Sequence, residues 1–209
     1  MQDLVLGSDG VMAGSGNDTE INGGTLQVDG TINGGSGVVQ VFANGTLSGA
    51  GEIRRDANIF GSLSPGNSTG TLTFGTEATN RTMTLNDGFS YLWEYDTDDD
   101  SSDLIFINGL LDLNNSNTAN TIINLVGLTG TDFASFGGTS TLFATTGGVL
   151  GATNGQILDW TVQFDGQEQT TYFAVVDGNN VILAIPEPGT LVLIGLAGIA
   201  GLIGFRRRR

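Results

Sequence analysis

The sequence lacks cysteine and histidine, and its seven basic residues are all arginines because it contains no lysine. Without thiols and imidazoles, thiolate catalysis, zinc-finger ligation and histidine-based acid–base chemistry are excluded. Against the seven arginines stand 22 acidic residues, which gives a formal charge of −15 at pH 7. A surface this acidic repels a phosphate backbone, so nucleic-acid binding is excluded as well.

Proline is also scarce, with three residues, whereas glycine accounts for 34 of the 209 residues. Glycine inside a helix costs about 1 kcal/mol relative to alanine, so this composition disfavours long soluble helices. Hydrophobic residues make up 39% of the chain and charged residues only 14%. This is enough apolar material for a sizeable core, and we therefore expect an ordered all-β body.

The longest uncharged apolar run is residues 189–205, close to the C-terminal end. A helix of this length, at about 1.5 Å per residue, approaches the thickness of a bilayer core. The run is followed directly by Arg206, Arg207, Arg208 and Arg209. Basic flanks stay on the cytoplasmic side, so the pattern predicts one transmembrane α-helix with a stop-transfer cluster and an exported body.

Two of the three prolines stand just before this run, in Pro186-Glu187-Pro188. Each proline fixes φ and biases the preceding residue toward an extended conformation, so the tripeptide should project as a short rigid strand. A Pro-Glu-Pro motif, an apolar span and an arginine cluster, in this order, resemble the PEP-CTERM sorting signal of Gram-negative bacteria. The sorting signal would then cover residues 186–209.

The resemblance implies that an exosortase, a membrane-embedded protease or transpeptidase, recognises Pro186, Glu187 and Pro188 and removes the tail. It also implies that the protein passes through the inner membrane and ends at the cell surface or in the extracellular matrix. Residues 1–20 contain no basic and apolar stretch typical of a secretory signal peptide. We interpret them as an irregular segment of a truncated sequence, followed by an exported β-repeat domain at 21–185.

The body contains a short repeat, since Ile21-Asn22-Gly23-Gly24 recurs 11 residues later as Ile32-Asn33-Gly34-Gly35. Gly-Thr/Ser-Leu/Ile triplets, which suit short strands between glycine turns, stand at 24–26, 30–32, 45–47, 61–63 and 70–72. Local chemistry leaves two architectures open. Asn-Gly turns favour an antiparallel β-sandwich, whereas a regular strand–turn repeat equally suits a parallel β-helix.

Residues 44–53 and 60–74 resemble the autotransporter-associated β-strand repeat, and the likeness continues more loosely through 102–110. The resemblance implies a right-handed parallel β-helix of short coils with an irregular β cap. We adopt this fold as the prediction and keep the antiparallel β-sandwich as the alternative.

The most regular strand pattern places four aromatic residues on one face, Phe89, Tyr91, Trp93 and Tyr95. Large rings are buried on average, so we favour their filling the end of the core over a platform for sugar rings. The acidic turn that follows fails the EF-hand pattern, because Ser101 and Ile107 occupy the positions of the required Gly and Glu. We favour a solvated turn over weak calcium binding. The weak candidate ligand surface comprises Tyr91, Trp93, Asp96, Asp98 and Asp100.

Catalysis is not expected, although parallel β-helices include polysaccharide lyases and hydrolases. The only basic residues outside the tail are Arg54, Arg55 and Arg81, and the acidic residues cluster in a turn with no sign of burial. We expect a non-catalytic protein without cofactor or metal, with an exosortase, the membrane and extracellular polysaccharide as partners. The alternative is a carbohydrate- or calcium-binding adhesin.

Overall fold

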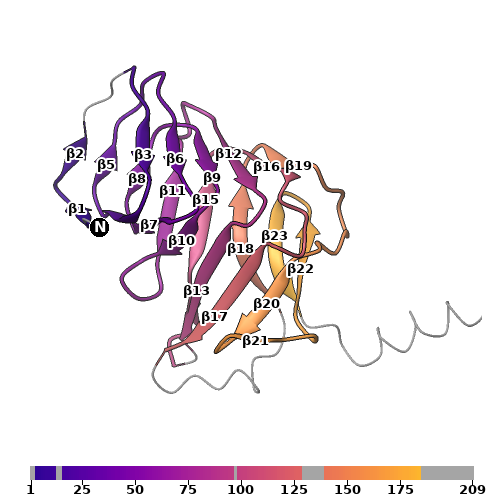
Figure 1. Ribbon diagram of the computed structural model, residues 1–209. Coiled ribbons are helices and arrows are strands. Elements are labelled where there is room, and N and C mark those ends of the chain that lie inside the picture. Colours follow the sequence, from indigo (N-terminus) through magenta and orange to yellow (C-terminus); the bar gives the residue numbers. More distant parts are fainter. Residues whose placement is uncertain (1–2, 13–15, 97, 129–138, 185–209) are drawn as a thin grey trace, which may run out of the picture.

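The computed structural model describes residues 3–12, 16–96, 98–128 and 139–184 (Figure 1). Every regular element in these ranges is a β-strand, which confirms the predicted all-β class. The described ranges contain no helix of sufficient length and hydrophobicity to cross a membrane. The transmembrane helix predicted for 189–205 lies outside these ranges.

The strands form three sheets. The first sheet runs in the order β1 (Leu4–Leu6), β4 (Gly24–Val28), β7 (Gly45–Gly49), β10 (Ser62–Pro65), β13 (Ser90–Asp96), β17 (Ile122–Gly127), β20 (Thr161–Phe164) and β21 (Gln167–Glu168), with β14 (Ser101–Ser102) beside β13. The second runs β2 (Val11–Met12), β5 (Thr31–Ile32), β8 (Glu52–Ile53), β11 (Thr71–Phe74), β15 (Leu104–Ile107), β18 (Thr139–Thr145), β23 (Asn180–Ala184) and β22 (Phe173–Asp177). The third runs β19 (Gly148–Leu150), β16 (Gly109–Asn115), β12 (Arg81–Asn86), β9 (Ala57–Ile59), β6 (Val39–Val41) and β3 (Thr19–Ile21).

The chain visits the three sheets in turn, and we call one such circuit a coil (Figure 1). Strands β1, β2 and β3 make the first coil, and each pairs in parallel with its counterpart in the second coil, β4, β5 and β6. Antiparallel pairing between named strands involves β14, β21, β22 and β23. This mostly parallel architecture is consistent with a β-helix and not with the antiparallel sandwich.

The length of an early coil is close to twice the repeat seen in the sequence. Leu26 pairs with Leu47 and Ile32 with Ile53, each 21 residues further on. The 11-residue spacing instead connects Ile21, at the end of β3, to Ile32, at the end of β5, in a different sheet. The sequence repeat therefore connects two strands of different sheets, with β4 between them in the chain, and does not mark successive coils.

Strands also occur within residues 1–20, where the sequence predicted an irregular segment. β1, β2 and the beginning of β3 lie there, and they pair in register with the second coil. Short strands such as Val11–Met12 have too few residues to show a period, which is why the sequence pattern does not reveal them.

The core is built from side chains that stack from one coil to the next. Along the first sheet the register aligns buried residues of successive coils, namely Leu26, Leu47, Leu63, Tyr91, Ile123 and Val162. Side chains on these strands alternate between buried and partly exposed positions, as expected when one face of a sheet covers a core.

Candidate functional site

The acidic turn predicted from the sequence lies at the tip of an antiparallel hairpin formed by β13 and β14. Tyr95 pairs with Ser102 and Asp96 with Ser101. The Asp98 backbone N–H donates to Asp96 Oδ1 at 2.9 Å, and Asp98, Asp99 and Asp100 are exposed. Asp100 adopts a φ of 50°, which a short polar side chain tolerates in a tight turn.

Tyr91 and Trp93 are not available to a ligand, because neither side chain has exposed surface. The Trp93 indole Nε1–H donates to the Asp103 carbonyl at 2.9 Å, and the Tyr91 hydroxyl donates to the Leu142 carbonyl at 3.4 Å. Because side chains alternate along a strand, both residues point into the core, and they do not belong to a ligand surface.

The buried rings of β13, with Phe89 directly before the strand, belong to an aromatic cluster that fills the later coils. Phe89 contacts Trp160 edge-on, with ring centroids 5.4 Å apart, and Tyr91 contacts Phe143 in the same way at 5.2 Å. Edge-to-face contacts at these distances are favourable beyond the burial of area. The aromatic face of this strand therefore acts as core packing.

Tyr95 is the partly exposed member of the aromatic row, and it links the core to the hairpin tip. Its ring stacks on Trp93 with centroids 5.6 Å apart and an interplanar angle of 13°. Its hydroxyl donates to Asp100 Oδ1 at 3.0 Å, and desolvation together with this contact raises the pKa of Tyr95. The hydroxyl thereby holds the Asp100 carboxylate in place.

Tyr95 and Asp100 line a cavity of about 530 Å³, which we call the polar cavity. Its other walls come from the hairpin and from the starts of three strands of the second sheet, namely Ser102, Thr71, Leu104, Thr139, Ser140 and Thr141. Apart from Leu104, every lining side chain carries a hydroxyl or a carboxylate. Of the residues that the sequence nominated as a ligand surface, only Asp100 lines this cavity.

Asp103 is a residue whose importance the sequence did not reveal. Its side chain is fully buried, and its two carboxylate oxygens accept backbone N–H groups of Gly70 at 2.9 Å and Glu94 at 3.0 Å. Burial raises the pKa of Asp103 from its ordinary 3.8 to about 7, partly opposed by these two hydrogen bonds. Asp103 ties the hairpin to the start of β11, and it does not line the polar cavity.

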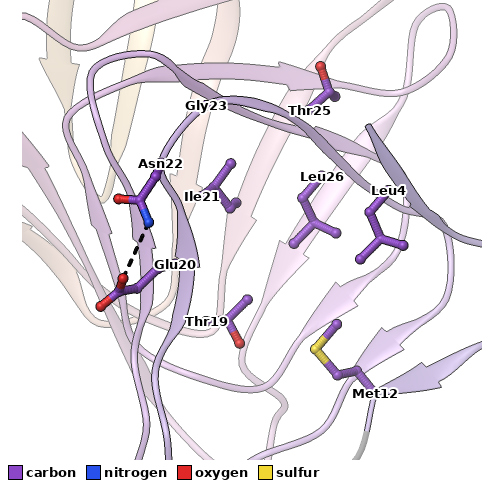
Figure 2. Close-up of a pocket in the computed structure, with 9 residues that line it drawn as sticks. All are labelled: Leu4, Met12, Thr19, Glu20, Ile21, Asn22, Gly23, Thr25 and Leu26. Atoms are coloured by element: carbon purple, nitrogen blue, oxygen red, sulfur yellow. Dashed lines mark hydrogen bonds between the residues drawn. The ribbon is translucent and has the colours of Figure 1, made fainter. Parts of the chain in front are cut away.

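A second cavity, of about 410 Å³, lies at the first coil, and we call it the end cavity. Figure 2 shows the residues that line it: Leu4, Met12, Thr19, Glu20, Ile21, Asn22, Gly23, Thr25 and Leu26. Asn22 donates to Glu20 Oε2 at 3.3 Å, and Glu20 is the one titratable group in the lining. The end cavity therefore exposes core aliphatics and does not assemble catalytic groups.

The described ranges contain no set of side chains that could bind a metal ion. No group of three Asp or Glu side chains there is arranged so that it could hold an ion. Asp96, Asp98 and Asp100 do not converge in the way that a calcium loop requires, because such a site needs six or more oxygen ligands around one centre.

The three basic residues of the body also lie outside the lining of the polar cavity. Arg54 forms an ion pair with Glu52 at 2.6 Å, and Arg55 is buried and donates to the Asn33 carbonyl at 2.9 Å. The third, Arg81, begins β12 in the third sheet. Neither cavity therefore combines a base with a carboxylate in the way that a lyase requires.

Comparison with known families concerns the C-terminal end. Residues 184–209 match the model of the PEP-CTERM protein-sorting motif. The chain carries a PEP-CTERM sorting signal. A search of curated proteins finds no match to the chain.

The PEP-CTERM match confirms the resemblance seen in Pro186, Glu187, Pro188 and the arginine cluster 206–209, all of which lie outside the described residues. The PEP-CTERM motif indicates an exported protein that an exosortase processes at the membrane. The likeness of residues 44–53 and 60–74 to autotransporter-associated repeats stays a prediction.

Proposed function

We propose that this PEP-CTERM protein is a non-catalytic component of the cell surface or the exopolysaccharide matrix. In this proposal residues 189–205 are a temporary membrane helix, and Arg206 to Arg209 hold its end in the cytoplasm while the body crosses. The exosortase recognises Pro186-Glu187-Pro188 and separates the body from the helix. The observation that carries the proposal is the sorting-motif match over residues 184–209.

The position of the motif relative to the fold supports this order of events. The last strand, β23, ends at Ala184, and it is paired on both sides, with β18 and with β22. Cleavage near Pro186 would leave all of these strand pairs in place. A signal that can be removed without unfolding the body is what a processed anchor requires.

The body suits a structural role. For its winding we infer right-handed coils with the antiparallel strands as a cap, because crossovers between parallel strands of one sheet are right-handed in nearly all proteins. Asp103, a carboxyl with a strongly raised pKa, is buried and accepts two backbone hydrogen bonds. Such a group stabilises a corner of the fold and has no access to a substrate.

The proposal is tested by following the C-terminal end of the chain in cells that contain the exosortase. Mass spectrometry of the surface fraction should find a chain ending close to Pro186. The Glu187→Ala variant should remain in the inner membrane with Arg209 still attached. Glu168→Ala, which changes an exposed glutamate of β21, is the matched control and should be processed normally.

A surface chain that still ends at Arg209 in the wild type would refute processing and leave a permanent anchor. Normal release of the Glu187→Ala variant would refute recognition of the tripeptide. In a host without an exosortase, all three proteins should accumulate uncut in the membrane.

A further inference from the structure

The polar cavity is assembled from segments that are far apart in the sequence. Thr71 pairs with Leu104 across the second sheet, and β18 continues that sheet on the other side of β15. The β13–β14 hairpin brings Tyr95 and Asp100 to the same place. The cavity therefore depends on the fold and is not the surface of a single loop.

Hydrogen-bonding side chains make up the lining except for Leu104, among the described residues. The Ser102 and Ser140 hydroxyls lie 3.1 Å apart and share a hydrogen bond. Thr71, Thr139 and Thr141 also line the cavity, and within the described residues no protein group accepts a hydrogen bond from their hydroxyls. A hydroxyl both donates and accepts, so this wall complements a ligand that carries many hydroxyls itself.

Asp100 gives the cavity its strongest acceptor. Its carboxylate is oriented by the Tyr95 hydroxyl at 3.0 Å, which makes Tyr95 a positioning residue. Hydrogen bonds to a charged acceptor are stronger than those between neutral groups. Leu104 adds an apolar contact of the kind that the C–H face of a sugar ring needs.

The charges in and around the cavity restrict the ligand further. Among the described residues, no arginine lines it, whereas a carboxylate does, and the whole chain has a formal charge of −15. A uronate or a sulfated sugar would meet repulsion without a compensating cation. The described residues also lack a three-carboxylate metal site through which an anionic sugar could be bridged.

We propose that the polar cavity binds a neutral saccharide unit, with Asp100 as the principal acceptor and Thr71, Ser102 and Thr141 as further hydrogen-bonding groups. The proposal depends on the proposed export in one respect: binding in the cell requires contact between the polar cavity and extracellular polysaccharide. Its chemistry depends on the cavity alone.

The test uses the purified full chain and isothermal titration with four soluble polysaccharides. Laminarin, dextran and galactomannan are the neutral probes, and polygalacturonate is the anionic one. We expect saturable binding of at least one neutral probe, unchanged by EDTA, and no binding of polygalacturonate. Asp100→Asn should weaken binding about tenfold, because it removes the charge that strengthens the hydrogen bonds.

The matched control is Asp99→Asn, which removes one exposed carboxylate from the same turn without touching the cavity lining. Its affinity should equal that of the wild type. Tyr95→Phe should weaken binding about fivefold in the wild-type background and have no effect once Asp100 is Asn. This loss of additivity distinguishes positioning of Asp100 from a general structural effect.

Three results would overturn the proposal: no neutral probe binds, polygalacturonate binds best, or Asp100→Asn behaves like Asp99→Asn. Circular dichroism should show that each variant is folded, and Thr141→Val supplies a second cavity variant if one is not. Titration in solution does not require cleavage of the tail. A chain that binds a neutral polysaccharide but is never processed in cells would refute the sorting proposal alone.

Discussion

The first coils and the later coils of the molecule (Figure 1) differ in length and in the side chains that fill the core. In the early part, paired residues of neighbouring coils are 16 to 22 positions apart, from 22 between Leu4 and Leu26 to 16 between Leu47 and Leu63. In the later part the separation grows, to 28 positions between Leu63 and Tyr91 and 39 between Ile123 and Val162.

The two parts also differ in what fills the core. The early interior holds aliphatic side chains such as Val28, Ile32 and Val41, whereas the later interior holds Phe89, Tyr91, Trp93, Phe143 and Trp160. The additional residues of the later coils form features that the early coils lack, including the β13–β14 hairpin beside the polar cavity. The regular early coils form a scaffold, and the additional residues of the later coils, such as the β13–β14 hairpin, form the place where a ligand site can be built.

The largest expected effect is the loss of an aromatic side chain from the later core. Trp93→Ala should lower the free energy of unfolding by about 3–5 kcal/mol, because it removes a fully buried ring and leaves a cavity. Urea unfolding followed by circular dichroism measures the change.

The control for this prediction is an aromatic residue on the outside of the early coils. Phe60 is 39% exposed and stacks on Phe42 with centroids 6.4 Å apart. Phe60→Ala should cost about 1 kcal/mol. Equal losses for the two variants would contradict the view that the aromatic cluster carries the later core.

The early coils should be sensitive instead to the close approach of neighbouring backbones. A Cβ on Gly45, at the start of β7, would lie 2.2 Å from the Ile21 carbonyl oxygen at the end of β3. Gly45→Ala should therefore destabilise the protein by about 1–3 kcal/mol, because β7 would have to move away from the end of β3.

Gly7→Ala is the matched control, because no atom lies within 4 Å of a Cβ placed there and no positive φ is required. Its stability should equal or slightly exceed that of the wild type. A Gly45→Ala variant as stable as Gly7→Ala would show that the coils can separate without loss.

Much of this contrast is visible in the sequence, and some of it is not. The glycine content indicated an all-β body, and the alternation of Phe89, Tyr91 and Trp93 favoured burial on one face, as the structure has it. The local sequence could not decide between parallel coils and an antiparallel sandwich, because this choice depends on pairing between residues about 21 positions apart. Family resemblance, not strand propensity, favoured the parallel arrangement.

The polar cavity and Asp103 illustrate what local patterns miss. Asp103 stands in a run of acidic residues that reads as a solvated turn, yet contact with Gly70, 33 positions earlier, makes it a buried acceptor. The cavity depends in the same way on β18 lying beside β15. One signal was present: a carboxylate directly before the apolar strand Leu104–Ile107 is poorly placed for solvent.

The remaining expected effect is a dependence of stability on pH that originates at Asp103. Its pKa is raised to about 7 from an ordinary 3.8, so between these values the folded protein holds a proton that the unfolded chain releases. The free energy of unfolding should therefore fall as pH rises from about 4 to about 7, by up to about 1.4 kcal/mol per unit, and not change further on this account at higher pH. Glu94, whose pKa burial also raises, contributes in the same direction.

Asp103→Asn should flatten this dependence, although it lowers stability at every pH because its amide group must face a backbone N–H. Asp99→Asn removes one exposed carboxylate and should keep the wild-type slope. Urea titrations at pH 5 and pH 8 measure both. Equal slopes in the two variants would assign the pH dependence to the general charge of −15 and not to the buried corner of the hairpin.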